Sequence, residues 1–256
     1  MAELFDMKMR AKRRDRAARS DLFLHERAFE DCLERIEAMQ RQFDRALLIG
    51  CADQQWPARI ASVAGQVDVR EPAPLLAKRA NGKPIVEDAW EPDAGAFNLV
   101  VAVGTLDTVN DLPIALRLIR HAMANGGLLI GAMSGGDTLP QLRGAMRAAD
   151  AVTAAASPHV HPRIEASALA PLLSSAGFVN PVVDVDRVAV TYGSLDRLVA
   201  DLRSMGATNI LNARPRFVGK AARETAIKAF SDAADGTRTT ETFEILHFAG
   251  WTGIKA

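Results

Sequence analysis

The chain has 256 residues, 48% of them apolar and 24% charged, and its 31 basic and 31 acidic side chains give a formal net charge of zero. This composition is ordinary for a soluble globular protein with a substantial core, and a neutral chain has no overall field that would attract nucleic acid. Two cysteines exclude a disulfide framework, and with no recognisable secretory signal or long apolar run we expect a cytoplasmic protein without a transmembrane segment.

The chain begins with a basic segment. Residues 7–19, MKMRAKRRDRAAR, contain seven basic side chains against a single acid, Asp15. Such a run is most often a solvated arm. The alternative is a docking arm that makes a peripheral contact with an acidic partner or an anionic membrane surface. Insertion into a membrane is not predicted, because the run lacks a large apolar face. We divide the chain into this N-terminal arm (1–26) and a main α/β domain (27–256).

After the arm, strands and helices alternate. An amphipathic helix is predicted over 29–43 from apolar residues at steps of three and four. Strands follow at 46–50, 66–69, 84–87, 97–103, 128–133 and 181–186 and in the closing TFEILHFAGW, with helices at about 56–64, 71–80, 111–124, 166–176, 194–205 and 217–234. Continuous apolar strands such as LVVAV (99–103) indicate burial on both faces, hence a parallel sheet covered by helices. Residues 134–165 interrupt the alternation and are predicted to form a lid or substrate region, and 194–236 a helical part.

The turn after the first strand, GCADQQ (50–55), is the first candidate site. In doubly wound sheets, ligands bind beyond the carboxyl ends of the strands, where the strand order reverses. Turns that hold a nucleotide-like cofactor there usually carry two or three glycines, whereas this one carries only Gly50.

Several motifs occur in one order along most of the chain: FNLVVAVGTLDTVNDLP, GAMSGGDTLPQLR, SPHVHP, LLSSAGF, VTYGSLDRLVADLRSMGATN and FEILHFAGW. In these motifs the chain resembles the class I S-adenosylmethionine-dependent methyltransferase superfamily. More narrowly, it resembles the branch of the mitochondrial complex I assembly factor that hydroxylates an arginine, and more distantly the acyl-carrier methyltransferase of the biotin pathway. The resemblance implies a Rossmann-like, doubly wound, mostly parallel seven-stranded sheet with an antiparallel C-terminal strand and an added helical region. It also implies S-adenosylmethionine as cofactor.

The resemblance also implies cofactor-binding positions. An acid at the end of the second strand holds the ribose hydroxyls in the family, and Asp68 is taken to match it. An acid after the third strand lies near the adenine amino group, and Asp88 is taken to match that one. A carboxylate suits both positions because it accepts hydrogen bonds only. The full predicted set is Gly50, Cys51, Ala52, Asp68, Val69, Asp88, Ala89 and Val103.

The turn departs from the family pattern. Leu48 replaces the acid of the first strand, and Ala52 and Gln54 replace two glycines, while Asp53 adds a negative charge beside the expected cofactor carboxylate. The adenosine end of the site therefore matches the family and the methionine end does not. Three outcomes stay open: weak or shifted cofactor binding, binding of another adenosine-containing ligand, or a retired site on a retained fold.

Asp137 and His159 are the catalytic candidates, because the loops that carry them follow the fifth strand, where a substrate should approach. His159 and His161 in SPHVHP could pair with Asp137 or Glu165 as iron ligands, but histidines one residue apart are common in polar loops, and no metal site is predicted. Cys51 is interpreted as a packing residue, since no histidine is evidently paired with it.

Two functions are consistent with these residues. One is an enzyme that modifies a protein side chain or a small acceptor. The other is a non-catalytic assembly factor for a respiratory complex I subunit, with the basic arm as part of its docking surface. A nucleic-acid substrate is not predicted, because VGTLDT stands where an Asn-Pro-Pro-Tyr motif would be expected and the aromatic residues are few.

Overall fold

The computed structural model describes residues 3–17, 22–153, 156–213 and 218–253. The helices are α1 (Met7–Asp15), α2 (Phe23–Ala38), α3 (Trp56–Ile60), α4 (Pro74–Arg79), α5 (Leu112–Ala122), α6 (Pro140–Thr153), α7 (Ala166–Ser175), α8 (Leu195–Ser204) and α9 (Lys220–Asp232), with a 3₁₀ turn at Leu106–Thr108. The strands are β1 (Phe43–Ile49), β2 (Ala64–Glu71), β3 (Lys83–Pro84), β4 (Phe97–Val103), β5 (Met123–Ser134), β6 (Phe178–Tyr192) and β7 (Thr239–Thr252).

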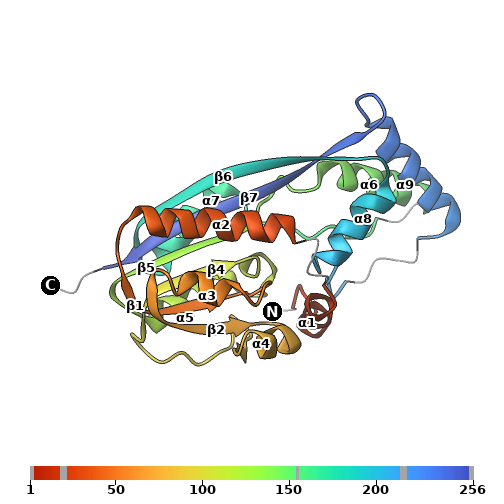
Figure 1. The fold of residues 1–256 in the computed structure, drawn as a ribbon. Coiled ribbons are helices and arrows are strands. Elements are labelled where there is room, and N and C mark those ends of the chain that lie inside the picture. The colour runs from red at the N-terminus through yellow and green to blue at the C-terminus, as the bar shows by residue number, and fades with distance from the viewer. Residues whose placement is uncertain (1–2, 18–21, 154–155, 214–217, 254–256) are drawn as a thin grey trace.

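All seven strands form one sheet in the order β3-β2-β1-β4-β5-β7-β6 (Figure 1). The first five are parallel, and β7 runs antiparallel between β5 and β6. The strand order reverses between β1 and β4, so the carboxyl ends of these two strands mark the switch point where doubly wound sheets bind ligands. This arrangement confirms the predicted fold class.

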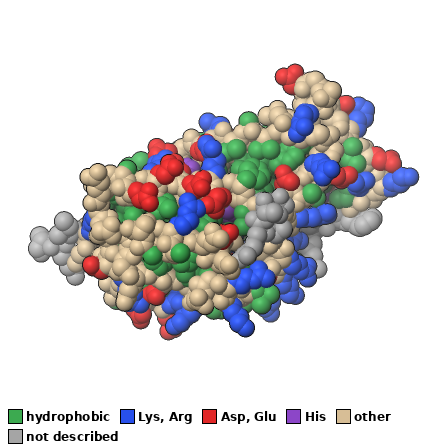
Figure 2. Space-filling model, viewed as in Figure 1, with side chains coloured by type: hydrophobic (Ala, Val, Ile, Leu, Met, Phe, Trp, Pro, Cys, Tyr) green, Lys and Arg blue, Asp and Glu red, His purple; other side chains and the backbone are tan. Residues whose placement is uncertain are grey.

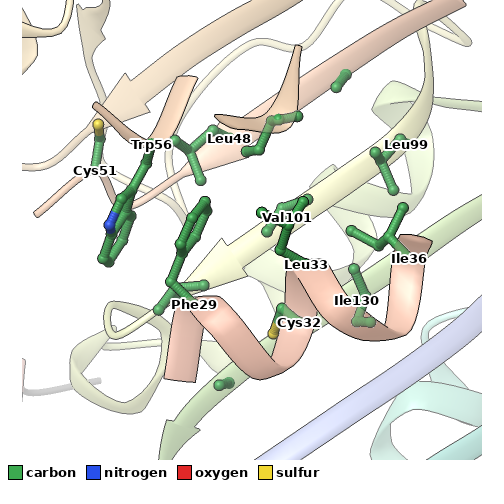
Figure 3. Close-up of a cluster of buried hydrophobic side chains, with 14 of the residues drawn as sticks. Phe29, Cys32, Leu33, Ile36, Leu48, Cys51, Trp56, Leu99, Val101 and Ile130 are labelled. Atoms are coloured by element: carbon green, nitrogen blue, oxygen red, sulfur yellow. The ribbon is translucent and has the colours of Figure 1, made fainter. Parts of the chain in front are cut away.

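The core consists of layers on the two faces of the sheet. Alternate residues of β1 point to opposite faces, as strand geometry requires. On one face, α2 and α3 cover the strands, and Figure 3 shows Phe29, Cys32, Leu33 and Ile36 of α2 directed at them. On the other face, α5 and α7 provide the cover.

A third apolar cluster packs α6, α8 and α9 against the ends of β6 and β7, which extend beyond the parallel strands (Figure 1).

Several element boundaries differ from the sequence prediction. The predicted helix 29–43 lies at Phe23–Ala38, because the left-handed backbone of Gln40 (φ 51°) follows its end and Phe43 already starts β1. β2 extends to Glu71, so the next helix begins at Pro74 rather than at residue 71. β6 is much longer than 181–186, because its register with β7 continues to Tyr192.

Part of the basic arm is folded. Asp6 caps α1 by accepting a hydrogen bond from the backbone N–H of Met9 at 2.8 Å, and Arg10 and Arg14 are buried. The interpretation of the arm as solvated is therefore wrong for Arg10 and Arg14, whereas Lys8 and Lys12 are exposed. In the described part of the chain no helix is both long and apolar enough to span a bilayer. The cytoplasmic location stays a prediction.

Phe29→Ala should destabilise the fold strongly. Phe29 is fully buried and stacks on Trp56 with 4.3 Å between ring centroids, so truncation leaves a cavity under α2. The expected loss in the free energy of unfolding is about 3–5 kcal/mol by urea denaturation. Leu75→Ala is the control, because Leu75 is 55% exposed. Equal losses for the two variants would contradict this description of the core.

Candidate functional site

The turn after β1 is closed against the strand beside it. Gly50 has φ +82°, and a Cβ there would lie 2.3 Å from the carbonyl oxygen of Val103, so only glycine fits. The buried N–H of Cys51 donates to Oε2 of Glu71 at 2.7 Å. Burial raises the pKa of the Cys51 thiol to about 12, so the thiol stays protonated near neutral pH, as expected of a side chain packed in the core.

Glu71 ends β2 and is fully buried at the carboxyl edge of the sheet. Arg14 of α1 pairs with it in bidentate fashion, from Nε at 2.7 Å and Nη2 at 2.8 Å. The N–H of Ala73 also donates to it, at 3.0 Å. Burial alone would raise the pKa of Glu71, but the charge and hydrogen bonds of Arg14 outweigh burial and hold that pKa below its ordinary value.

Glu87 makes the same kind of contact a short distance beyond β3. It too is fully buried, and Arg10 binds both of its oxygens at 2.7 and 2.8 Å. Both arginines also reach the turn after β4: Arg10 Nη2 donates to the carbonyl of Thr105 at 2.7 Å, and Arg14 Nη1 donates to that of Gly104 at 3.0 Å. The arginines thus connect the ends of β2 and β3 to the end of β4, across the switch point.

The position of α1 is fixed at both ends. Asp15 accepts hydrogen bonds from the N–H groups of Leu75 and Leu76 at 3.0 and 3.1 Å and so caps α4. At the other end, Phe5 packs with Ile210 and Leu211 in a small apolar cluster. Arg10 and Arg14 are four residues apart, so one face of α1 presents both guanidinium groups to the carboxyl edge of the sheet.

A cavity of about 120 Å³ remains beneath α1. Its polar lining includes Arg10, Arg14, His25, His161 and Glu244. Burial, assisted by nearby arginine charges, lowers the pKa of both histidines to about 4, so both are neutral near pH 7. Sites for drug-sized ligands usually measure ~300–1,000 Å³. With α1 in this position, the space does not fit a nucleoside cofactor.

The two acids predicted to bind the cofactor, Asp68 and Asp88, are not the buried acids that pair with α1 at the carboxyl edge of the sheet, which are Glu71 and Glu87. Asp68 lies inside β2, three residues before its end; it is 37% exposed and pairs with Arg45 at 2.6 Å. Asp88 accepts a hydrogen bond from the N–H of Asp111 at 2.8 Å, at the start of α5. Glu71 is the residue at the carboxyl end of β2, so the placement of Asp68 at the strand end is corrected. Spacing does not separate Asp68 from Glu71, since both follow Gly50 by about 20 residues, the separation expected of a ribose ligand; only the end of β2 does.

The other predicted binding residues are partly assembled. Gly50, Cys51 and Ala52 form the turn, and Val103 lies against Gly50 at the end of β4. Val69 is buried in the core beneath α2 and α3, whereas Ala89 is exposed.

The structure does not bring the two catalytic candidates together. Asp137 is exposed and pairs with Arg187 at 3.1 Å. His159 bonds to Asp150 at 2.8 Å and lines a separate surface pocket. His161, two residues away, instead lines the cavity beneath α1 and accepts a hydrogen bond from the N–H of Ile210 at 2.9 Å. Among the residues that the structure describes, no group of three or more His, Cys, Asp or Glu side chains is placed to hold a metal ion.

Comparison with known proteins agrees with this architecture. A family model described as a methyltransferase domain matches residues 19–181. The chain is 31% identical to the mitochondrial arginine-hydroxylase NDUFAF5 of Mus musculus, over 97% of this chain and 77% of that protein. It is 30% identical to the malonyl-[acyl-carrier protein] O-methyltransferase of Nitrosospira multiformis, over 80% of this chain and 59% of that protein.

Among solved structures, the YcgJ protein of Bacillus subtilis superposes with a TM-score of 0.59 over 88% of this chain and 100% of that one. At 9% identity, this likeness shows the fold alone.

Removing one partner of the Arg14–Glu71 pair should destabilise the protein by about 3–5 kcal/mol, because a buried charge loses its counter-charge. The double variant Arg14→Met/Glu71→Gln should lose less than the sum of the two single variants, as measured by urea denaturation. The control is the exposed pair Arg223–Asp196, for which about 0–1 kcal/mol is expected. Additive losses at Arg14 and Glu71 would show that the two groups are not coupled.

Acid should weaken the same contact. Because the folded-state pKa of Glu71 is depressed, its stabilisation is complete above the ordinary glutamate pKa of about 4.3 and is lost as the pH falls through the folded value. Between about pH 5 and pH 3, the wild-type free energy of unfolding should fall more steeply than that of Arg14→Met/Glu71→Gln. Parallel curves for the two proteins would rule out this contribution.

Proposed function

Because this chain belongs to the methyltransferase-domain family and is related to the mitochondrial arginine hydroxylases, we propose that it is an S-adenosylmethionine-dependent enzyme that modifies a protein side chain or a small acceptor. A subunit of a respiratory complex is the protein substrate that this relationship suggests. The cofactor site is the carboxyl edge of the sheet, between the turn at Gly50 and the residues that follow β3.

The observation that carries the proposal is the pair of buried carboxylates Glu71 and Glu87. Glu71 is the last residue of β2 and Glu87 lies three residues after β3, beside the switch point of the sheet, where a doubly wound fold binds its ligand. A carboxylate at the end of β2 suits the two ribose hydroxyls, and one after β3 suits an adenine amino group, because both ligand groups are hydrogen-bond donors. Glu71 and Glu87 therefore take the roles first assigned to Asp68 and Asp88.

A non-catalytic assembly factor is the second candidate. Two observations favour the assembly factor. Ala52 and Gln54 replace glycines in the turn, and arginines already pair with both buried carboxylates. In this case the fold would serve to hold a partner such as a respiratory-complex subunit, and the cofactor site would be a remnant. The two candidates differ in whether an adenosyl ligand binds at all.

Calorimetric titration with S-adenosylhomocysteine separates them. Under the enzyme proposal, the wild-type chain binds the ligand at millimolar concentration or below, and Glu71→Gln weakens binding at least tenfold because an acceptor of the ribose hydroxyls is altered. Asp68→Asn is the matched control, since Asp68 pairs with Arg45 at the surface and should leave the affinity unchanged.

An effect of Asp68→Asn equal to that of Glu71→Gln would contradict the assignment of the ribose ligand. No detectable binding at millimolar ligand would favour the assembly factor, to be pursued by capture of respiratory-complex subunits.

A further inference from the structure

We propose that α1 is an internal occupant of the cofactor site, in which Arg14 and Arg10 take the two carboxylates that an adenosyl ligand requires. Helix α1 in its present position and the ligand then exclude each other, and binding requires α1 to leave. This inference rests on the proposed function, because it concerns access to the same site.

The hydrogen bonds of Glu71 give the first argument. Its Oε1 accepts from Arg14 Nε and from the N–H of Ala73, and its Oε2 accepts from Arg14 Nη2 and from the N–H of Cys51. A carboxylate has about four acceptor positions, and all are used. A ribose hydroxyl can reach Glu71 only by replacing one of these donors, and Arg14 is the donor supplied by a separate, movable element.

The space at the switch point gives the second argument. The two guanidinium groups bridge from Glu71 and Glu87 to the carbonyls of Gly104 and Thr105, so they lie across the crevice between β4 and the β2–β3 side of the sheet. The cavity of about 120 Å³ beneath α1 is what remains, well below the ~300 Å³ at which sites for larger ligands begin. Removing the two arginine side chains would enlarge this space at the carboxylates.

The way α1 is attached gives the third argument. Its apolar contacts are modest: Met7 and Met9 are only partly buried against the small cluster of Phe5, Ile210 and Leu211. The contacts that hold α1 at the sheet edge in the described structure are mostly polar: two ion pairs, the bonds of the same arginines to the carbonyls of Gly104 and Thr105, the bond of Arg13 to the carbonyl of Asn209, and the cap that Asp15 provides for α4. Helix α1 lies outside the main core, whereas α2 is packed within it, so α1 is the element that the proposal displaces.

The outward face of α1 supplies a matched control. Lys8 and Lys12 have the same four-residue spacing as Arg10 and Arg14 but are exposed, and Figure 2 shows basic side chains gathered over this end of the molecule. Replacing the outer pair therefore changes the charge of the helix equally without touching either carboxylate.

The test titrates S-adenosylhomocysteine into three proteins: the wild type, Arg10→Ala/Arg14→Ala and Lys8→Ala/Lys12→Ala. The arginine variant should bind at least tenfold more tightly than the wild type, and the lysine variant within about twofold of it. Adding Glu71→Gln to the arginine variant should abolish the gain, because the carboxylate set free is the one that the ligand uses. Circular dichroism establishes that each variant is folded.

Hydrogen exchange of the wild-type chain gives an independent measurement. Saturating S-adenosylhomocysteine should speed exchange of the α1 backbone amides while leaving those of α2 unchanged. This measurement decides the matter if the arginine variant does not fold.

Two outcomes overturn the inference, and they differ in what they say of the proposed function. If the wild type binds the ligand while the α1 amides stay protected, or if the arginine variant binds no more tightly than the wild type, α1 is not an occupant of the site. The enzyme proposal is unaffected by either result. No binding by either the wild type or the folded arginine variant removes both.

Discussion

The buried ion pair between Arg14 and Glu71 organises the functional edge of this protein. One carboxylate joins the end of β2, the turn after β1 through Cys51, the start of α4 through Ala73, and α1 through Arg14. An ionised carboxylate without partners would be very unfavourable at this depth, so in the ligand-free fold these four elements meet at Glu71. The Arg10–Glu87 pair repeats the arrangement one strand further along.

The altered glycine turn is consistent with this arrangement. In a turn that binds a cofactor, several N–H groups face the ligand and glycines let it approach closely. Here the N–H of Cys51 is directed at Glu71, and Ala52 is 9% exposed. The turn therefore directs a backbone donor at a protein carboxylate, the same one that Arg14 binds.

The sequence predicted the sheet well and the site only in part, for physical reasons that differ. The parallel strands are buried on both faces, so runs such as LVVAV identify them without further information. Asp68 was expected at the end of β2 but lies three residues before it, because hydrophobic periodicity does not fix where a strand stops. The partner of Glu71 was not predictable at all, since Arg14 lies 57 residues away and its role depends on how α1 docks. Asp137 and His159 were both predicted as catalytic, but Asp137 pairs with Arg187 and His159 hydrogen-bonds with Asp150.

Composition alone predicted a solvated arm for the basic run at the start of the chain, because composition does not show which side chains face inward. Helical geometry divides the run into an inner pair, Arg10 and Arg14, and outer residues that include Lys8 and Lys12. Glu71 and Glu87 neutralise the charges of the inner pair inside the protein. Only the outer residues contribute to the field that a partner or a membrane would meet. The folded part of the arm therefore has two faces: an inner face paired with two buried carboxylates, and an exposed outer face that carries Lys8 and Lys12.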